Sequence, residues 1–236
     1  MRVLIGDPDA SLEEHYAPPR LPWLRANMVS SLDGAVTGAD GRSGSINNAA
    51  DKLVFDLLRD TCDAVLVGAG TARAEGYGPA AAPLVVVSRS GSVPPTLRTA
   101  GPGRVLLATC AVAPGLDQAT ALLGVEQVLV CGDDEVDLAA VVDTLHARGL
   151  RHLLCEGGPR LLTDLLAAGL VDELAATYVP LLVGGAGPRI TQGAHVGLSA
   201  VPRLLLEQDG TLLGRWWLRG PGDDVPRHHA SKVNPG

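Results

Sequence analysis

The sequence has few aromatic residues, because Phe, Trp and Tyr together make up only 3% of its 236 residues. Hydrophobic residues still amount to 46%, so Val, Leu and Ala must do the packing in the core. A chain of this length can bury a full core as one large or two small domains. No apolar run reaches 18 residues, and the amino terminus lacks the basic-then-apolar pattern of a signal peptide. We therefore expect a soluble, cytoplasmic protein without a membrane partner.

Motifs for several kinds of chemistry are also missing. The P-loop pattern GxxxxGK[ST] does not occur, which argues against a kinase or NTPase. No HExxH pattern or Cys/His cluster predicts a metal site. The four cysteines are far apart and form no CxxC pair, so buried free thiols are expected rather than disulfides. The formal charge of −7 argues against a nucleic-acid partner.

Short apolar runs alternate with helical patterns. The helices are expected at residues 49–60, at 137–148 and from Pro159 onward. Asp209-Gly210 is the strongest hairpin signal and joins the runs 203–208 and 211–218. The other strands are expected at 23–29, 64–67, 84–87, 105–108, 127–131, 151–155 and 172–179.

This order of elements predicts an α/β fold with a mostly parallel central sheet, flanking helices and a C-terminal antiparallel hairpin. No linker divides the pattern, so we expect one domain over residues 23–219. Residues 1–22 are rich in proline and are expected to form an irregular N-terminal arm, and residues 220–236 a disordered tail.

Polar or glycine-rich segments follow four of the expected strands, where open α/β sheets bind their ligands. In the last of them, Gly157-Gly158 allows a ligand to approach the main chain, and Pro159 suits the first position of a helix. The first amides of that helix are unpaired donors at the positive end of its dipole. A phosphate-bearing ligand is therefore expected at this edge. The four segments are Ser30–Gly34, Gly68–Thr71, Ser88–Gly91 and Glu156–Arg160.

Arg89 and Asp51 are the charged residues whose position suggests a specific role. A guanidinium makes paired, charge-assisted hydrogen bonds to phosphate, so Arg89 between Ser88 and Ser90 suits the 2′-phosphate of NADP. The alternative is a solvated surface arginine. Asp51 lies in the first turn of a helix, where an acid complements the helix dipole, or else it faces the ligand and holds or protonates a ring nitrogen.

Several segments of the chain form one recognisable pattern. They are Ser30-Ser31-Leu32-Asp33-Gly34, Gly41-Arg42-Ser43, Asp63–Thr71, Glu156-Gly157-Gly158-Pro159, and Val171-Asp172-Glu173-Leu174 with Pro180 and Gly184. Taken together, these segments resemble the RibD C-terminal family, the pyrimidine reductases of riboflavin biosynthesis. The resemblance extends over residues 23–218 and implies a single dihydrofolate-reductase-like domain, a homodimer and a cis peptide bond between Gly157 and Gly158. It also implies NADPH-dependent reduction of 5-amino-6-(5-phosphoribosylamino)uracil.

The resemblance assigns roles to particular residues. Ser43, Arg59 and Glu156 would face the substrate, and Asp33 would organise the loop between substrate and cofactor. Asp51 and Glu156 are the candidate catalytic residues. The expected contacts with NADPH are Ser30, Ser45, Ile46, Gly68, Gly70, Thr71, Glu75, Ser88, Arg89, Gly157, Gly158, Pro159, Arg160, Leu161 and Leu162.

One segment departs from the family pattern. After Thr71 the riboflavin enzymes usually have an Asp-Asn/Asp-Pro-x-Leu-x-x-Arg segment, whose arginine binds the substrate phosphate. This chain instead reads Arg73-Ala74-Glu75-Gly76-Tyr77-Gly78-Pro79, which has no such arginine. Asp51 stands where dihydrofolate reductases place an acid against the pterin ring. Two alternatives therefore remain open. One is the same chemistry on dihydrofolate or another pterin, and the other is a protein that binds NADP(H) without turnover.

Overall fold

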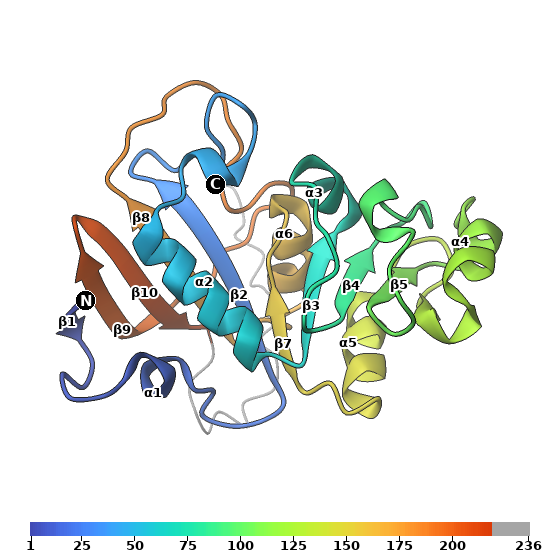
Figure 1. Cartoon of the computed structure of the whole chain (residues 1–236), viewed down its shortest axis with the longest axis horizontal. Coiled ribbons are helices and arrows are strands. Elements are labelled where there is room, and N and C mark those ends of the chain that lie inside the picture. The colour runs from blue at the N-terminus through green and yellow to red at the C-terminus, as the bar shows by residue number, and fades with distance from the viewer. Residues whose placement is uncertain (219–236) are drawn as a thin grey trace, which may run out of the picture.

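The computed structural model describes residues 1–218, and a ten-stranded sheet runs through this part of the chain in the order β1-β9-β10-β8-β2-β7-β3-β4-β5-β6 (Figure 1). The strands are β1 (Arg2–Ile5), β2 (Trp23–Ser31), β3 (Ala64–Gly68), β4 (Leu84–Val87), β5 (Val105–Thr109), β6 (Val128–Val130), β7 (His152–Cys155), β8 (Glu173–Val179), β9 (Val201–Gln208) and β10 (Thr211–Trp217).

The strands from β8 to β6 in this order are parallel to one another, and the hairpin β9–β10 joins them through an antiparallel pairing of β10 with β8. The predicted fold class is therefore confirmed. The helices are α1 (Leu12–Tyr16), α2 (Ala49–Thr61), α3 (Ala69–Ala74), α4 (Leu116–Leu123), α5 (Leu138–Ala147) and α6 (Pro159–Ala167), with short 3₁₀ turns at Ser43–Ser45, Pro95–Leu97 and Val125–Gln127.

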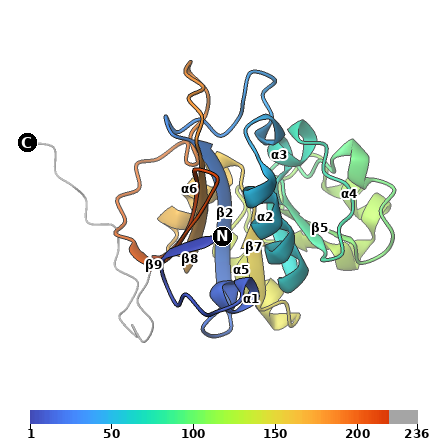
Figure 2. The ribbon, with the colours of Figure 1, turned by 60° about the vertical axis from the view of Figure 1, so that its left-hand side comes forward.

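Successive side chains of the buried strands point to opposite faces of the sheet, so the core has two parts, one on each face. Val65 and Val67 pack on one face with Leu58 of α2, whereas Leu66 packs on the other with Leu165 of α6. Figure 2 shows the sheet lying between these helices. Because both faces are covered, these strands read as continuous apolar runs, and the two layers of helices leave the strand ends free to form a site.

The prediction of an irregular arm over residues 1–22 was wrong. Strand β1 pairs with β9, from the opposite end of the described chain, and α1 begins with a capping box in which Ser11 and Glu14 bond each other's backbone amides. Pairing across such a separation leaves no local signal, and a five-residue helix is too short for a clear periodicity. The predicted disordered tail, residues 220–236, lies outside the described residues.

A buried ionic cluster joins this N-terminal segment to the sheet. The Glu173 carboxylate accepts hydrogen bonds from Arg25 Nε (2.6 Å) and from Arg215 Nη2 (2.6 Å), and Glu173 and Arg25 are both 0% exposed. The two guanidinium groups also donate to the backbone carbonyls of Tyr16 and Ala17, at the end of α1. One acid therefore compensates two cations that would otherwise be buried without a counter-charge.

We predict that Glu173→Gln lowers the free energy of unfolding by about 3–5 kcal/mol, because the change leaves both arginines buried without a counter-charge. Urea denaturation followed by circular dichroism measures this loss. Asp56→Asn is the matched control, because it breaks the exposed pair with Lys52 on α2 and should cost less than about 1 kcal/mol. Equal losses for the two variants would contradict the assigned role of the cluster.

Candidate active site

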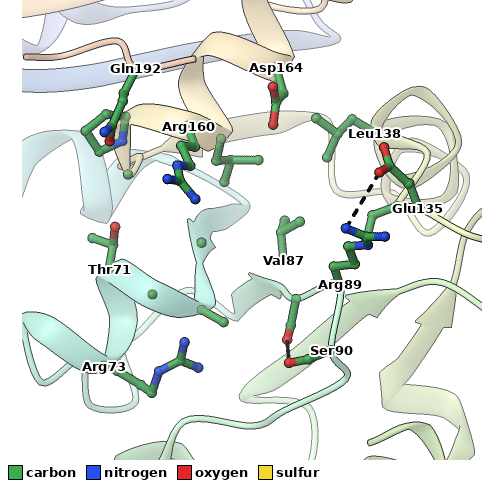
Figure 3. A pocket seen from close by; sticks show the side chains of 18 residues that line it. Thr71, Arg73, Val87, Arg89, Ser90, Glu135, Leu138, Arg160, Asp164 and Gln192 are labelled. Atoms are coloured by element: carbon green, nitrogen blue, oxygen red, sulfur yellow. Dashed lines mark hydrogen bonds and ion pairs between the residues drawn. The ribbon is translucent and has the colours of Figure 1, made fainter. Parts of the chain in front are cut away.

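Two adjoining cavities open at the carboxyl ends of the parallel strands, which is the edge expected from the sequence. The larger cavity has a volume of about 860 Å³ and lies over the ends of β3 and β4 and the start of α6 (Figure 3). The smaller, of about 240 Å³, lies between the start of α2 and the end of β7. They adjoin because Thr71, Gly158, Pro159 and Gln192 line both.

The glycine pair lies at the boundary between the cavities. The Gly157–Gly158 peptide bond is cis, as predicted, and the Gly157 carbonyl accepts a hydrogen bond from the Gly68 amide at 2.8 Å. A Cβ atom on residue 158 would collide with the Thr71 hydroxyl, and the φ of +83° at Gly157 favours glycine. Backbone therefore forms this part of the wall, and a ligand can approach the main chain closely.

The start of α6 contributes to the larger cavity. Gly158 is the N-cap, Pro159 occupies the first turn, and no side chain caps the helix. Residues 158–161 line the cavity, so the positive end of the helix dipole faces the enclosed space. This arrangement suits a phosphate group.

Three arginines surround the same cavity. Arg73, Arg89 and Arg160 come from α3, from the segment after β4 and from α6, and Figure 3 shows their side chains around the enclosed space. Two carboxylates, Glu135 and Asp164, also line it, so the charges of these five residues sum to one positive charge. The cationic lining and the backbone wall together fit the phosphates of a dinucleotide.

The smaller cavity has the opposite charge. Its lining includes three acids, Asp51, Glu75 and Glu156, and no Lys or Arg among the described residues. Asp51 is only 3% exposed, and burial raises its pKa above the ordinary range while Thr177 acts in the opposite direction. Asp51 thus combines access to the cavity with a protonated form that persists to a higher pH.

Glu156 is held at the edge of this cavity by three hydrogen bonds. Arg59 donates through Nε and Nη2, each at 2.7 Å, and the Tyr77 hydroxyl donates at 2.6 Å. The Arg59 guanidinium also lies 4.4 Å from the centre of the Phe55 ring and 5.2 Å from that of Tyr77. Burial raises the pKa of Tyr77, so its hydroxyl remains a donor. The result is a fixed carboxylate whose charge Arg59 balances.

The structure brings most of the expected cofactor contacts into the two cavities. Ser43 and Glu75 line the smaller one, where the Ser43 amide donates to the Glu75 carboxylate at 2.9 Å. Asp51 and Glu156 line it as well, and Arg59 reaches it through Glu156. The expected residues that line the larger cavity are Gly68, Gly70, Thr71, Ser88, Arg89, Gly158, Pro159, Arg160 and Leu161.

Several expected contacts lie outside the cavity linings and remain predictions. Ser30, Ile46 and Leu162 are buried, and Ser45 bonds its own loop through the Gly38 amide. Gly157 precedes Gly158, and its carbonyl accepts a hydrogen bond from the Gly68 amide at the end of β3.

Asp33 also lies outside the linings, on the exposed surface. It accepts hydrogen bonds from the Ser31 hydroxyl and from the amides of Val183 and Gly184, and these bonds lower its pKa to about 2. Asp33 therefore joins the end of β2 to the glycine-rich loop after β8.

Sequence reasoning did not identify several lining residues. Tyr77 lies in the segment that departs from the family pattern. Gln192 lies in the long loop before β9, where its backbone N–H donates to the Pro159 carbonyl and the Thr163 hydroxyl. Glu135 lies in an acidic turn that reads as ordinary surface. None of these positions carries a local signal, because only the folded chain brings them to the strand ends.

Two further observations concern residues 1–218 only. No helix there is long and apolar enough to cross a membrane, and no group of three or more His, Cys, Asp and Glu side chains could hold a metal ion.

Comparisons with known proteins agree with the geometry. Residues 22–210 match the model of the RibD C-terminal domain, which confirms the resemblance drawn from the motifs. The chain is 32% identical over 183 residues to the 2,5-diamino-6-ribosylamino-4(3H)-pyrimidinone 5′-phosphate reductase of Archaeoglobus fulgidus, a match covering 70% of this chain and 83% of that protein. The structure of a pyrimidine reductase-like protein from Corynebacterium diphtheriae superimposes with a TM-score of 0.75 at 25% identity, covering 85% of this chain and 93% of that one.

The shared fold also extends to longer proteins. RibD of Acinetobacter baumannii superimposes with a TM-score of 0.69 at 21% identity, covering 85% of this chain and 59% of that chain.

We predict that Tyr77→Phe lowers the free energy of unfolding by roughly 1.5 kcal/mol, the lower end of the range for a hydrogen bond to a charged group. The change leaves the aromatic ring over Arg59 and removes only the bond to Glu156. Denaturant titration measures the loss. Tyr178→Phe serves as the control, because it also removes a tyrosine hydroxyl and keeps the ring, which packs edge-on against Trp216. An unchanged stability in Tyr77→Phe would contradict the contribution of this bond.

Proposed function

Since the chain belongs to the RibD C-terminal domain family, we propose that it is an NADPH-dependent reductase of riboflavin biosynthesis. The proposed acceptor is 5-amino-6-(5-phosphoribosylamino)uracil. The diaminopyrimidinone phosphate named for the Archaeoglobus fulgidus relative differs in its ring substituents and is the natural comparison in any assay.

The observation that carries this proposal is that a cavity lined by arginines adjoins a cavity lined by acids. Hydride transfer requires the nicotinamide and the acceptor ring to lie against each other with water excluded. A dinucleotide with its phosphates among the arginines would reach the smaller cavity across Thr71 and Gly158, which line both spaces.

The residues divide the work between binding and orientation. The start of α6, Arg73 and Arg160 would hold the pyrophosphate, and Arg89 with Ser88 would hold the 2′-phosphate. When bound, the cofactor supplies the hydride. The chain's own contribution to the acceptor is the side chains of Asp51 and Glu156. Both can accept hydrogen bonds from ring N–H and amino groups, and Asp51 can also donate a proton in its protonated form.

A second candidate is reduction of dihydrofolate or a related pterin on the same scaffold. Two observations favour it. Asp51 is buried in the smaller cavity, and none of the residues that line this cavity is a Lys or Arg that could bind a 5′-phosphate. The third possibility, binding of NADP(H) without turnover, leaves Asp51 and Glu156 in the smaller cavity without a role.

Oligomeric state and location belong to the same proposal. A homodimer is supported by exposed apolar side chains at the ends of β2 and β8, where Leu32 and Leu182 are 61% and 78% exposed. Cytoplasmic location is supported by four free thiols, at Cys62, Cys110, Cys131 and Cys155.

We predict that the purified chain oxidises NADPH in the presence of the phosphoribosylamino-pyrimidine. Turnover is followed by nicotinamide absorbance, with the uracil, the diaminopyrimidinone and dihydrofolate as parallel acceptors. Turnover of dihydrofolate alone would replace the leading proposal with the second candidate. Binding of NADPH without oxidation by any of the three would indicate the non-catalytic alternative.

The pH dependence tests the role of Asp51. Because burial raises its pKa, the protonated form persists to higher pH, and a rate that depends on a proton from Asp51 falls as the pH rises through that pKa. We predict that Asp51→Asn lowers kcat by about 10²-fold and removes this limb of the profile. Asp56→Asn on the exposed side of α2 is the control. An unchanged profile in Asp51→Asn would assign the acid to the helix dipole instead.

A further inference from the structure

We propose that Glu135 and Arg89 together form a receptor for either form of the adenosine ribose, so that the protein binds NADH as well as NADPH and Glu135 sets the balance between them. This inference rests on the proposed function, because it concerns the cofactor of that reductase. It adds a residue to which neither the motifs nor the family resemblance assigned a role.

The position of the adenosine ribose follows from the arrangement of the two cavities. The nicotinamide must lie at the end that adjoins the smaller cavity, beside Thr71 and Gly158. The opposite end of the larger cavity is formed by the segments after β4 and β6, which lie further along the sheet from β7 than β3 does. Arg89 and Glu135 come from these two segments and face each other there (Figure 3).

Backbone hydrogen bonds hold the loop that presents Glu135. The Ala111 and Val112 amides donate to the Gly132 and Asp133 carbonyls at 3.0 and 3.1 Å, and the Asp137 amide closes the turn on the Cys131 carbonyl at 3.0 Å. The loop is therefore tied to the end of β5 and to the start of α5, while the Glu135 side chain remains 77% exposed. The carboxylate is free to meet a ligand from a fixed backbone position.

The contact between Arg89 and Glu135 is weak enough for either side chain to change partner. Their closest N···O distance is 3.8 Å, longer than a hydrogen bond, and the Arg89 side chain is 73% exposed. Exposed pairs of this kind contribute little to stability, because water screens them. A ligand that offers a better partner to one of them therefore meets little resistance from the other.

The two groups suit different ligands. A carboxylate accepts hydrogen bonds from ribose hydroxyls, so Glu135 matches the 2′-hydroxyl of NADH. A guanidinium flanked by hydroxyls matches a 2′-phosphate, and the Ser88 and Ser90 hydroxyls lie 3.3 Å apart beside Arg89. When a phosphate is bound, the Glu135 carboxylate repels it, which weakens NADPH. Glu135 thus favours NADH and limits the preference for NADPH that Arg89 provides.

The test is direct binding of NADPH and NADH, measured by isothermal titration calorimetry without an acceptor. In Glu135→Gln we expect NADH to bind about tenfold more weakly, because a neutral amide oxygen replaces the charged acceptor, and NADPH about threefold more tightly. Arg89→Ala should have the opposite effect, weakening NADPH by at least about tenfold and leaving NADH nearly unchanged. Asp133→Asn removes the same charge from the same loop outside the cavity and should leave both unchanged.

The deciding quantity is the ratio of the two dissociation constants. A rise of about tenfold or more in Kd(NADH)/Kd(NADPH) in Glu135→Gln, absent in Asp133→Asn, supports the proposal. A smaller change, or the same change in both variants, overturns it while NADPH binding still supports the proposed reductase. If the unaltered chain binds neither dinucleotide, the proposed function fails first, and this inference fails with it.

Discussion

The site depends on the close approach of two strand ends, where the amide of Gly68 after β3 bonds the carbonyl of Gly157 after β7. Only backbone fits at this point, because a side chain on residue 158 would collide with Thr71. The contact brings the start of α6 against α3 and leaves one continuous edge on which both cavities open. A ligand that crosses this contact meets main chain rather than side chains, so a long dinucleotide could pass from one cavity into the other. Its two ends would then lie in different surroundings.

Charge is distributed along this edge in a way that matches the proposed chemistry. Arginines gather where phosphates would lie, and carboxylates gather where an amino-substituted ring would lie. The overall charge of −7 does not attract an anionic ligand, so the local cluster of Arg73, Arg89 and Arg160 must overcome it. Arg59 pairs with Glu156 without lining the acidic cavity itself, so the ion pair adds no guanidinium to the cavity wall.

The positions of residues at the end of an expected strand or the start of an expected helix could be predicted from the sequence. Arg89 follows an apolar run, so the order of elements predicted that it lies at the strand-end edge. Asp51 opens a helical pattern, which left open whether it faces a ligand or only complements the helix dipole. Tyr77, Gln192 and Glu135 could not be found in this way, because each lies in a loop whose path is decided by distant contacts. The same limit applies to α1 and β1, which are stabilised by Arg25, Arg215 and β9 rather than by their own sequences.

The departure from the family pattern after Thr71 has a structural consequence. The segment that differs contains Tyr77, whose hydroxyl bonds Glu156 and whose ring packs against Arg59. The segment therefore acts on the Glu156 carboxylate, which lines the smaller cavity. The lining of the smaller cavity offers no Lys or Arg among the described residues, so an acceptor that binds there would be held through its ring rather than through a phosphate. Under the proposed function, the hydrogen bonds between that ring and the side chains of Asp51 and Glu156 would then select the acceptor.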